Sequence, residues 1–220
     1  MVIIKNRMKK RDELRKLDLQ FHTSFEHILK GRLSKFETRV VDNSAFDLIS
    51  GVSLKKSLNE QIDPTGDELF AIVGTITPYC GQGYFYTSIP NLVYGVLDDY
   101  YQTNNKLVDL KKEIDSNPAS IDEIKLFIKE HRFLFIDVIK HAWIPIESSE
   151  DKDILFYSLD YESFNKIKHI KKFICTSQNA YNCLKLIVKD DVEIEICHQD
   201  RFHIDENKWK ETLNHFNNIK

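Results

Sequence analysis

The sequence predicts an α/β protein, a three-layer α/β/α sandwich around a central, mainly parallel sheet of four strands. The first observation is alternation. Short apolar runs rich in β-branched and aromatic residues alternate with amphipathic segments at helical spacing from residue 67 onward. Such alternation builds βαβ units whose helices cover both faces of one sheet. The second observation is size, because 220 residues with 42% hydrophobic residues can bury a core of this kind.

A basic helical extension is expected over residues 1–66, packing on the core. Its main helix covers residues 9–31, where apolar residues recur at helical spacing: Leu14, Leu17, Phe21, Phe25 and Leu29. Beyond it, the sequence predicts a short strand at Thr38–Val41 and a turn at 63–66. Residues 1–40 hold eleven Lys and Arg against five Asp and Glu. This surplus suits a nucleic acid or an acidic partner, and it suits a solvated helix face equally well.

The α/β domain is expected over residues 67–220. The strands predicted in chain order are Leu69–Val73, Phe133–Ile139, Lys172–Thr176 and Val192–Cys197. The helices predicted between and after them are Asn91–Thr103, Ile121–Glu130, Tyr161–Lys168, Asn179–Val188 and Glu206–Phe216. Ser120 and Glu123 have the spacing of a capping box at the start of the second helix.

Ligands of parallel α/β sheets bind at the carboxyl ends of the strands. The loop after Val73 and the strand ends at His141, Ser177 and His198 should therefore lie along one edge of the sheet. This edge is where we expect a functional site.

Composition excludes several classes of protein. The four cysteines lack the spacings of a disulfide framework, a zinc site or an iron–sulfur cluster. We expect no metal and no cofactor, and reduced thiols suit a cytoplasmic protein. No apolar run approaches the length of a membrane span, so no membrane partner is expected. After residue 40, 29 Asp and Glu outnumber 20 Lys and Arg, which argues against nonspecific coating of DNA.

The most informative segment runs from Phe70 to Leu97. An apolar strand pattern ends at Gly74, a polar loop with two glycines follows, and an aromatic triplet at 84–86 precedes Asn91 and a helical pattern. Glycines let a backbone approach a ligand closely, and aromatic faces suit flat rings. The segment therefore suits a binding loop, although an ordinary connection with tyrosines packed in the core would explain it too.

Four motifs, taken in order, resemble the uracil-DNA glycosylase superfamily, and its mismatch-specific and hypoxanthine-DNA glycosylase branch most closely. The motifs are Val73-Gly-Thr-Ile-Thr77-Pro78, the aromatic segment Tyr84–Leu97, Asp137-Val-Ile followed by Ser148–Ile154, and Lys171–Tyr181. The resemblance covers roughly residues 68–217 and implies the three-layer fold of that superfamily.

The resemblance also implies an activity. The chain would be a monofunctional DNA glycosylase that hydrolyses the N-glycosidic bond of uracil or hypoxanthine in DNA by direct water attack, without a covalent lysine intermediate. Catalytic roles fall to Asn91 and Thr77, which would place the water, and to His198, which would donate to the departing base. Asn91 fits a helix N-cap equally well, and His198 fits an exposed loop position.

Base binding is implied for Tyr79, Phe85 and Cys80, with one of the two rings stacked under the base. Core packing is the alternative for both rings. Contacts with nucleic acid are implied for a further set of charged residues, Arg201, Lys171 and Lys172. Solvated surface positions are the alternative for these three charges.

Two departures from the superfamily favour a different function. Thr77 stands where most members carry Asp or Asn, and a threonine hydroxyl can orient water but is no general base near neutral pH. The Pro-Ser expected after Cys197 is replaced by His198-Gln199. The alternative is a catalytically inactive protein of this fold that binds nucleic acid, a nucleotide or, through the amino-terminal helix, a protein partner. A nucleotide or nucleoside hydrolase on the same scaffold is a further alternative.

Overall fold

The computed structural model describes residues 52–76, 83–87, 92–145, 154, 156–199 and 203–217. Its main sheet contains the strands β2 (Phe70–Gly74), β3 (Phe133–Asp137), β6 (Lys172–Cys175) and β7 (Glu193–Ile196). A second sheet contains β1 (Val52–Lys56), β4 (Ile139–Pro145) and β5 (Phe156–Leu159). The helices are α4 (Val93–Tyr101), α5 (Lys106–Glu113), α6 (Ser120–Glu130), α7 (Tyr161–Lys166), α8 (Gln178–Ile187) and α9 (Glu206–Asn217), with the 3-10 helix η1 (Asn59–Gln61). The helix predicted over 9–31 and the strand Thr38–Val41 lie outside the described residues.

The main sheet is parallel throughout and has the strand order β3-β2-β6-β7. In its register Phe70 faces Phe133, and Ala71 faces Phe173. β2, the first strand of this sheet along the chain, is therefore an interior strand. It has β3 on one side and β6, followed by β7, on the other. Both β2 and β3 are buried along their whole length, as expected of parallel strands that are covered on both faces.

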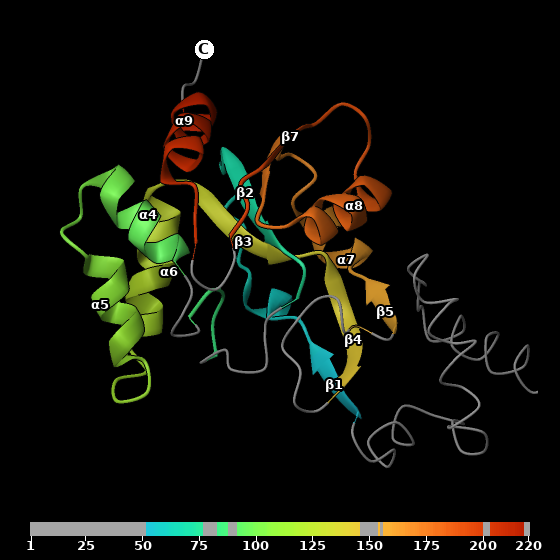
Figure 1. Cartoon of the computed structure of the whole chain (residues 1–220), viewed down its shortest axis with the longest axis horizontal. Coiled ribbons are helices and arrows are strands. Elements are labelled where there is room, and N and C mark those ends of the chain that lie inside the picture. The colour runs from blue at the N-terminus through green and yellow to red at the C-terminus, as the bar shows by residue number, and fades with distance from the viewer. Residues whose placement is uncertain are drawn as a thin grey trace, which may run out of the picture.

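Helices cover both faces of this sheet, which confirms the predicted three-layer α/β/α architecture (Figure 1). On one face Ile72 packs in a cluster with residues of α4, α5, α6 and α9, including the fully buried Trp209. On the other face Val73 packs in a second cluster with residues of α7 and α8, including Leu184. Alternate residues of β2 thus point to opposite layers, which is the two-residue period of a strand.

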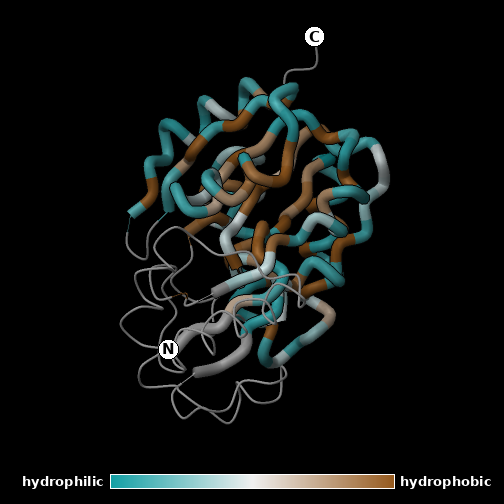
Figure 2. The backbone as a smooth tube through the Cα atoms, turned by 90° about the vertical axis from the view of Figure 1, so that its right-hand side faces the viewer, coloured by the Kyte–Doolittle hydropathy of each residue, from teal (hydrophilic) through white to brown (hydrophobic). Residues whose placement is uncertain are grey.

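The hydrophobic segments gather towards the interior of the described chain, while hydrophilic segments lie on its outside (Figure 2). Aromatic rings fill much of the layer that contains α4 and α6. Phe70 stacks on Phe133 with ring centroids 5.4 Å apart, and Phe135 meets Tyr86 and Tyr94 edge-on at 4.9 and 5.9 Å. Among the described residues, no helix is both long and apolar enough to cross a membrane.

The second sheet was not predicted from the sequence. Its order is β1-β4-β5, and both pairings are antiparallel. The prediction of one strand over 133–139 was wrong in this respect: β3 ends at Asp137, and after Val138 the chain continues as β4 in the other sheet. His141, which we expected on the ligand-binding edge, therefore lies within β4 and pairs with Lys56 of β1. Residues 52–66, assigned to the amino-terminal extension, include a strand of this sheet.

Two of the helix starts are explained by side chains. Ser177 caps α8 by accepting from the Ala180 N–H at 3.0 Å, and Asp160 caps α7 by accepting from the Ser163 N–H at 3.1 Å. The predicted capping box at Ser120 was wrong. The chain is already helical at Ala119, and the Ser120 N–H donates to Asn117 in a backbone turn, so Ser120 is the first residue of α6 and is fully buried.

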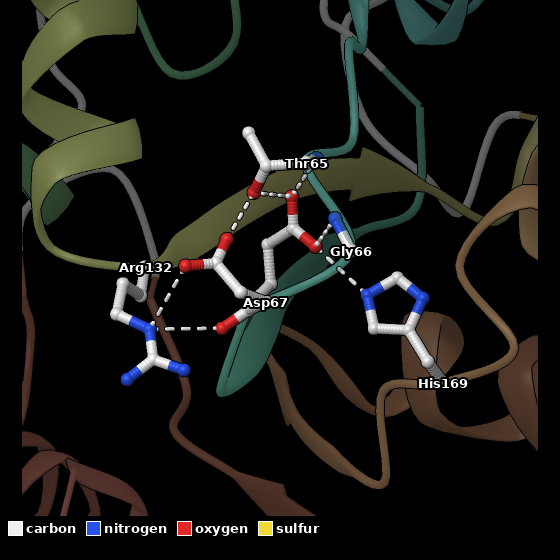
Figure 3. A network of polar contacts seen from close by, with 6 residues as sticks. Thr65, Gly66, Asp67, Arg132 and His169 are labelled. Atoms are coloured by element: carbon white, nitrogen blue, oxygen red, sulfur yellow. Dashed lines mark hydrogen bonds and ion pairs between the residues drawn. The ribbon is translucent and has the colours of Figure 1, made fainter.

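The amino-terminal edge of the main sheet is held by a polar cluster around the turn before β2 (Figure 3). The Glu68 carboxylate accepts from the Thr65 and Gly66 N–H groups at 2.5 and 3.0 Å and from His169 at 2.8 Å. Gly66 has a φ of 91°, which suits the predicted turn. Arg132 donates to the carbonyl of Asp67 at 2.9 Å, which ties this turn to the residue before β3.

Candidate functional site

The candidate site is the edge where the four parallel strands end, which we call the carboxyl rim. It consists of the strand ends Gly74, Asp137, Cys175 and Ile196 and the residues that follow each of them. After β2 the chain passes to the layer of α4, whereas after β6 it passes to α8 in the opposite layer. Neighbouring strands whose connections diverge in this way open a crevice between them, where ligands of α/β proteins bind.

A carboxylate and a phenol meet at Gly74 on the rim. If Gly74 carried a Cβ atom, it would lie 2.6 Å from Oδ1 of Asp137 and 3.0 Å from the hydroxyl of Tyr86. Both oxygens thus approach the main chain more closely than any side chain at position 74 would allow. The Asp137 residue is only 3% exposed. The arrangement places a group that accepts hydrogen bonds beside one that donates and accepts them.

Tyr86 holds this position with an unusual backbone. Its φ of 56° lies in the left-handed region, where a residue with a Cβ is disfavoured by roughly 1 kcal/mol or more. Packing fixes it there, because its ring meets Phe135 edge-on. The preceding residues are also anchored: the carbonyl of Phe85 accepts from the buried Tyr94 hydroxyl at 2.7 Å. Burial raises the pKa of Tyr94, so that hydroxyl keeps its proton.

Hydroxyl groups line the other side of the rim. Thr75 and Ser177 lie 3.0 Å apart through their side-chain oxygens, which joins the ends of β2 and β6. The Thr176 hydroxyl donates to the carbonyl of Val73 at 3.1 Å, and its N–H donates to the same carbonyl at 3.0 Å. These hydroxyl contacts therefore link the carboxyl ends of β2 and β6.

The end of β3 is fixed from outside the main sheet. The Asn59 side chain accepts from the Asp137 N–H at 2.9 Å and donates to the Asp137 carbonyl at 2.8 Å. It also donates to the Asp160 carboxylate at 2.8 Å. The segment η1, which lies between β1 and β2 in the chain, thus contacts Asp137, whose carboxylate lies at the rim.

The structure brings some of the predicted site residues to the rim and separates others. His198 lies two residues beyond the end of β7 and is exposed, and the next residue, Gln199, donates its N–H to the Thr176 carbonyl at 3.1 Å. Phe85 is 2% exposed and packs in the core, with its ring 5.4 Å from that of Tyr84, so its position favours the packing role. The other predicted site residues, Thr77, Tyr79, Cys80, Asn91 and Arg201, lie outside the described residues.

Lys171 and Lys172 lie at the opposite edge of the sheet. Lys172 begins β6, and with a rise of about 3.3 Å per residue it lies roughly 16 Å from Ser177. Lys171 forms an ion pair with Asp191 at 2.6 Å, and Lys172 donates to the carbonyl of Phe216 near the end of α9 at 3.2 Å. These two lysines are therefore not part of the rim.

Asp137 and Tyr86 are the rim residues that sequence reasoning did not select as functional. A single carboxylate that ends an otherwise apolar strand, Phe133–Asp137, is a signal that could have identified Asp137. The position of Tyr86 depends on its positive φ, which the triplet of aromatic residues does not predict. Within the part of the chain that the structure describes, no group of three or more His, Cys, Asp or Glu side chains is arranged to hold a metal ion.

Comparisons of the chain with protein-family models, with curated proteins and with solved structures find no match.

Proposed function

We propose that the chain is a monofunctional DNA glycosylase that hydrolyses the N-glycosidic bond of a deaminated base, uracil or hypoxanthine, in DNA. The observation that supports this best is the meeting of the Asp137 carboxylate and the Tyr86 hydroxyl at Gly74. It lies at the strand end that begins the motif resembling the uracil-DNA glycosylase superfamily.

The chemistry of these two groups fits a deaminated base. Uracil and hypoxanthine each present a ring N–H beside a carbonyl oxygen. A carboxylate accepts from the N–H, and a phenol hydroxyl donates to the carbonyl. Asp137 is nearly buried and the Tyr86 hydroxyl is fully buried, so a base reaches them only if neighbouring residues move, and the hydrogen bonds then form away from competing water. A base must be flipped out of the duplex to reach them, and its contacts in the pocket offset that cost of a few kcal/mol.

The remaining roles follow the resemblance. Asn91 and Thr77 place the attacking water, Tyr79 stacks on the base, and His198 donates to the departing base at the rim. DNA is the proposed partner, with Arg201 as a phosphate contact. We also propose a cytoplasmic location. Lys171 and Lys172 serve at most a more distant stretch of DNA, because they lie at the other edge of the sheet.

The test is release of free base from oligonucleotides that contain uracil, hypoxanthine, xanthine or a mismatch, followed by alkaline cleavage of the abasic site. We expect release of uracil or hypoxanthine in the presence of a chelator. Asp137→Asn and Tyr86→Phe each preserve the shape of the side chain, and each should lower kcat/KM by roughly 10–100-fold because one contact with the base costs about 1–3 kcal/mol. Rates equal to buffer on every substrate would exclude the enzyme.

A catalytically inactive binding protein is the second candidate. The burial of Phe85 supports it, because one of the two rings proposed to stack on the base packs in the core instead. This candidate predicts binding of the same oligonucleotides with no release of base. Gel-shift and release assays on one preparation distinguish the two functions.

A further inference from the structure

We propose that Asn59 is a positioning residue for Asp137, so that the segment before the main sheet belongs to the functional unit of the carboxyl rim. The inference rests on the proposed function in assigning Asp137 to the ligand. It adds a residue that neither the motifs nor the strand ends indicate.

Asn59 completes the pairing of an edge strand. Among the described strands of the main sheet, β3 pairs with β2 alone, and the N–H of Val138 donates to the carbonyl of Gly74 at 3.0 Å. Because backbone groups alternate in direction along a strand, the N–H and carbonyl of Asp137 point away from β2. The amide of Asn59 accepts from that N–H at 2.9 Å and donates to that carbonyl at 2.8 Å. One side chain therefore makes the two hydrogen bonds that the backbone of a neighbouring strand would make with Asp137.

Only an amide satisfies all of the groups around it. The second N–H of Asn59 donates to Oδ2 of Asp160 at 2.8 Å, and Asp160 also accepts from the N–H and hydroxyl of Ser163 at 3.1 and 2.8 Å. A carboxylate in place of Asn59 would bring two negative charges together, and an apolar side chain would leave buried backbone groups without partners. Asn59 itself is 2% exposed, so its hydrogen bonds are shielded from bulk water.

The position of the Asp137 carboxylate depends on this pairing. Its Oδ1 occupies space beside Gly74 that a side chain at that position would fill, since a Cβ there would lie only 2.6 Å away. A small rotation of the Asp137 backbone therefore moves the carboxylate relative to the Tyr86 hydroxyl. Misplacement of a reacting or binding group by about 1 Å can cost roughly 100-fold in rate.

The experiment compares Asn59→Ala with Ser163→Ala. The second substitution removes a hydrogen bond from the same network, to Asp160, without touching Asp137. We expect Asn59→Ala to lower kcat/KM for base release by roughly 100-fold, and Ser163→Ala to leave it within about threefold. The ¹³Cγ chemical shift of the Asp137 carboxyl should move in Asn59→Ala and stay unchanged in Ser163→Ala. If Asn59→Ala does not fold, Asn59→Ser, which keeps one hydroxyl, takes its place.

Equal effects of the two substitutions on kcat/KM and on the carboxyl signal would overturn the inference, because they would mean that Asn59 only stabilises the fold. An unmoved Asp137 signal in Asn59→Ala would overturn it as well. The carboxyl signal does not require activity. If the unsubstituted chain releases no base, the proposed function fails, and the NMR comparison still decides the role of Asn59.

Discussion

Replacing Gly74 with alanine tests the geometry of the carboxyl rim directly. A Cβ at this position would lie 2.6 Å from Oδ1 of Asp137, whereas ordinary van der Waals contact begins at 3.4 Å. The carboxylate must therefore retreat by about 0.8 Å, and the Tyr86 hydroxyl, at 3.0 Å, must give way as well. The hydrogen bonds from Asn59 oppose movement of the Asp137 backbone. Adding a methyl group to a site that resists it typically costs ~1–3 kcal/mol.

The control is Gly95→Ala in α4. The nearest atom to its new Cβ is 4.0 Å away, on Val108, so the methyl group fits. An alanine inside a helix is favoured over glycine by about 0.5–1 kcal/mol. Gly74→Ala likewise reduces the conformational freedom of the unfolded chain, which favours folding, but the clash with Asp137 and Tyr86 outweighs this gain. We therefore expect the free energy of unfolding to fall by roughly 0.5–2 kcal/mol for Gly74→Ala and to rise by roughly 0.5–1 kcal/mol for Gly95→Ala.

Urea unfolding followed by circular dichroism measures both changes, with equal m-values as the check that the unfolded states are comparable. The Gly74→Ala chain should also lose binding or base release at the rim, because its carboxylate is displaced. A Gly74→Ala chain as stable as the unsubstituted one, or more stable, would refute the close approach of Asp137 and Tyr86 to the main chain.

Three further expectations concern stability. Asp98→Ala should lower the free energy of unfolding, measured in urea, by ~2–3 kcal/mol. The buried Asp98 carboxylate accepts from two N–H groups in the first turn of α5, each at 2.9 Å, and the substitution would leave both without this acceptor. A loss below about 0.5 kcal/mol would contradict this. Burial alone would raise the pKa of Glu68, but hydrogen bonds from Thr65 and His169 hold it below its ordinary value. The stability that the charged Glu68 contributes is therefore fully present above its ordinary pKa and is lost as the pH falls through its lowered pKa. Glu68→Gln should thus lose less stability than the unsubstituted chain below about pH 5, which thermal melts across that range would measure. Burial, and then the charges of two neighbouring lysines, lower the pKa of His141, so charging it in acid costs stability. His141→Gln should thus lose less stability than the unsubstituted chain between about pH 7 and pH 5, and a parallel decline of both chains would be contrary evidence.

The main sheet could be predicted because its strands carry their own signal. Apolar runs such as Phe70–Gly74 and Phe133–Asp137 are buried on both faces, so the residues themselves indicate the strand. The second sheet could not be predicted in this way. β1 is short and depends on pairing with β4, some 90 residues away. The continuous apolar run across Val138 also conceals the point where the chain leaves one sheet for the other.

α5 was missed for a related reason. The helix is short and carries few apolar residues, and its first turn is stabilised by Asp98, a residue of the preceding helix. Intrinsic propensity in so short a segment is a weak signal, and the contact that stabilises it is not local.

The site was only partly predictable. The order of strands and helices indicated that the strand ends at Gly74, Ser177 and His198 form one edge, since that follows from parallel topology alone. The meeting of Asp137 and Tyr86 could not be predicted, because it depends on a left-handed residue and on Asn59, which is 78 residues from Asp137 in sequence. Such contacts exist only in the folded chain.

The central claim is that the carboxyl rim holds the base. The most direct test is to titrate ¹⁵N-labelled protein with a short oligonucleotide that contains uracil or hypoxanthine, using the same oligonucleotide with only the four ordinary bases as control. We expect the largest amide shifts at the rim residues Thr75, Tyr86, Asp137, Ser177 and His198, and we expect them only with the deaminated base. Shifts confined to Lys171 and Lys172 at the opposite edge, or identical shifts with both oligonucleotides, would contradict the claim.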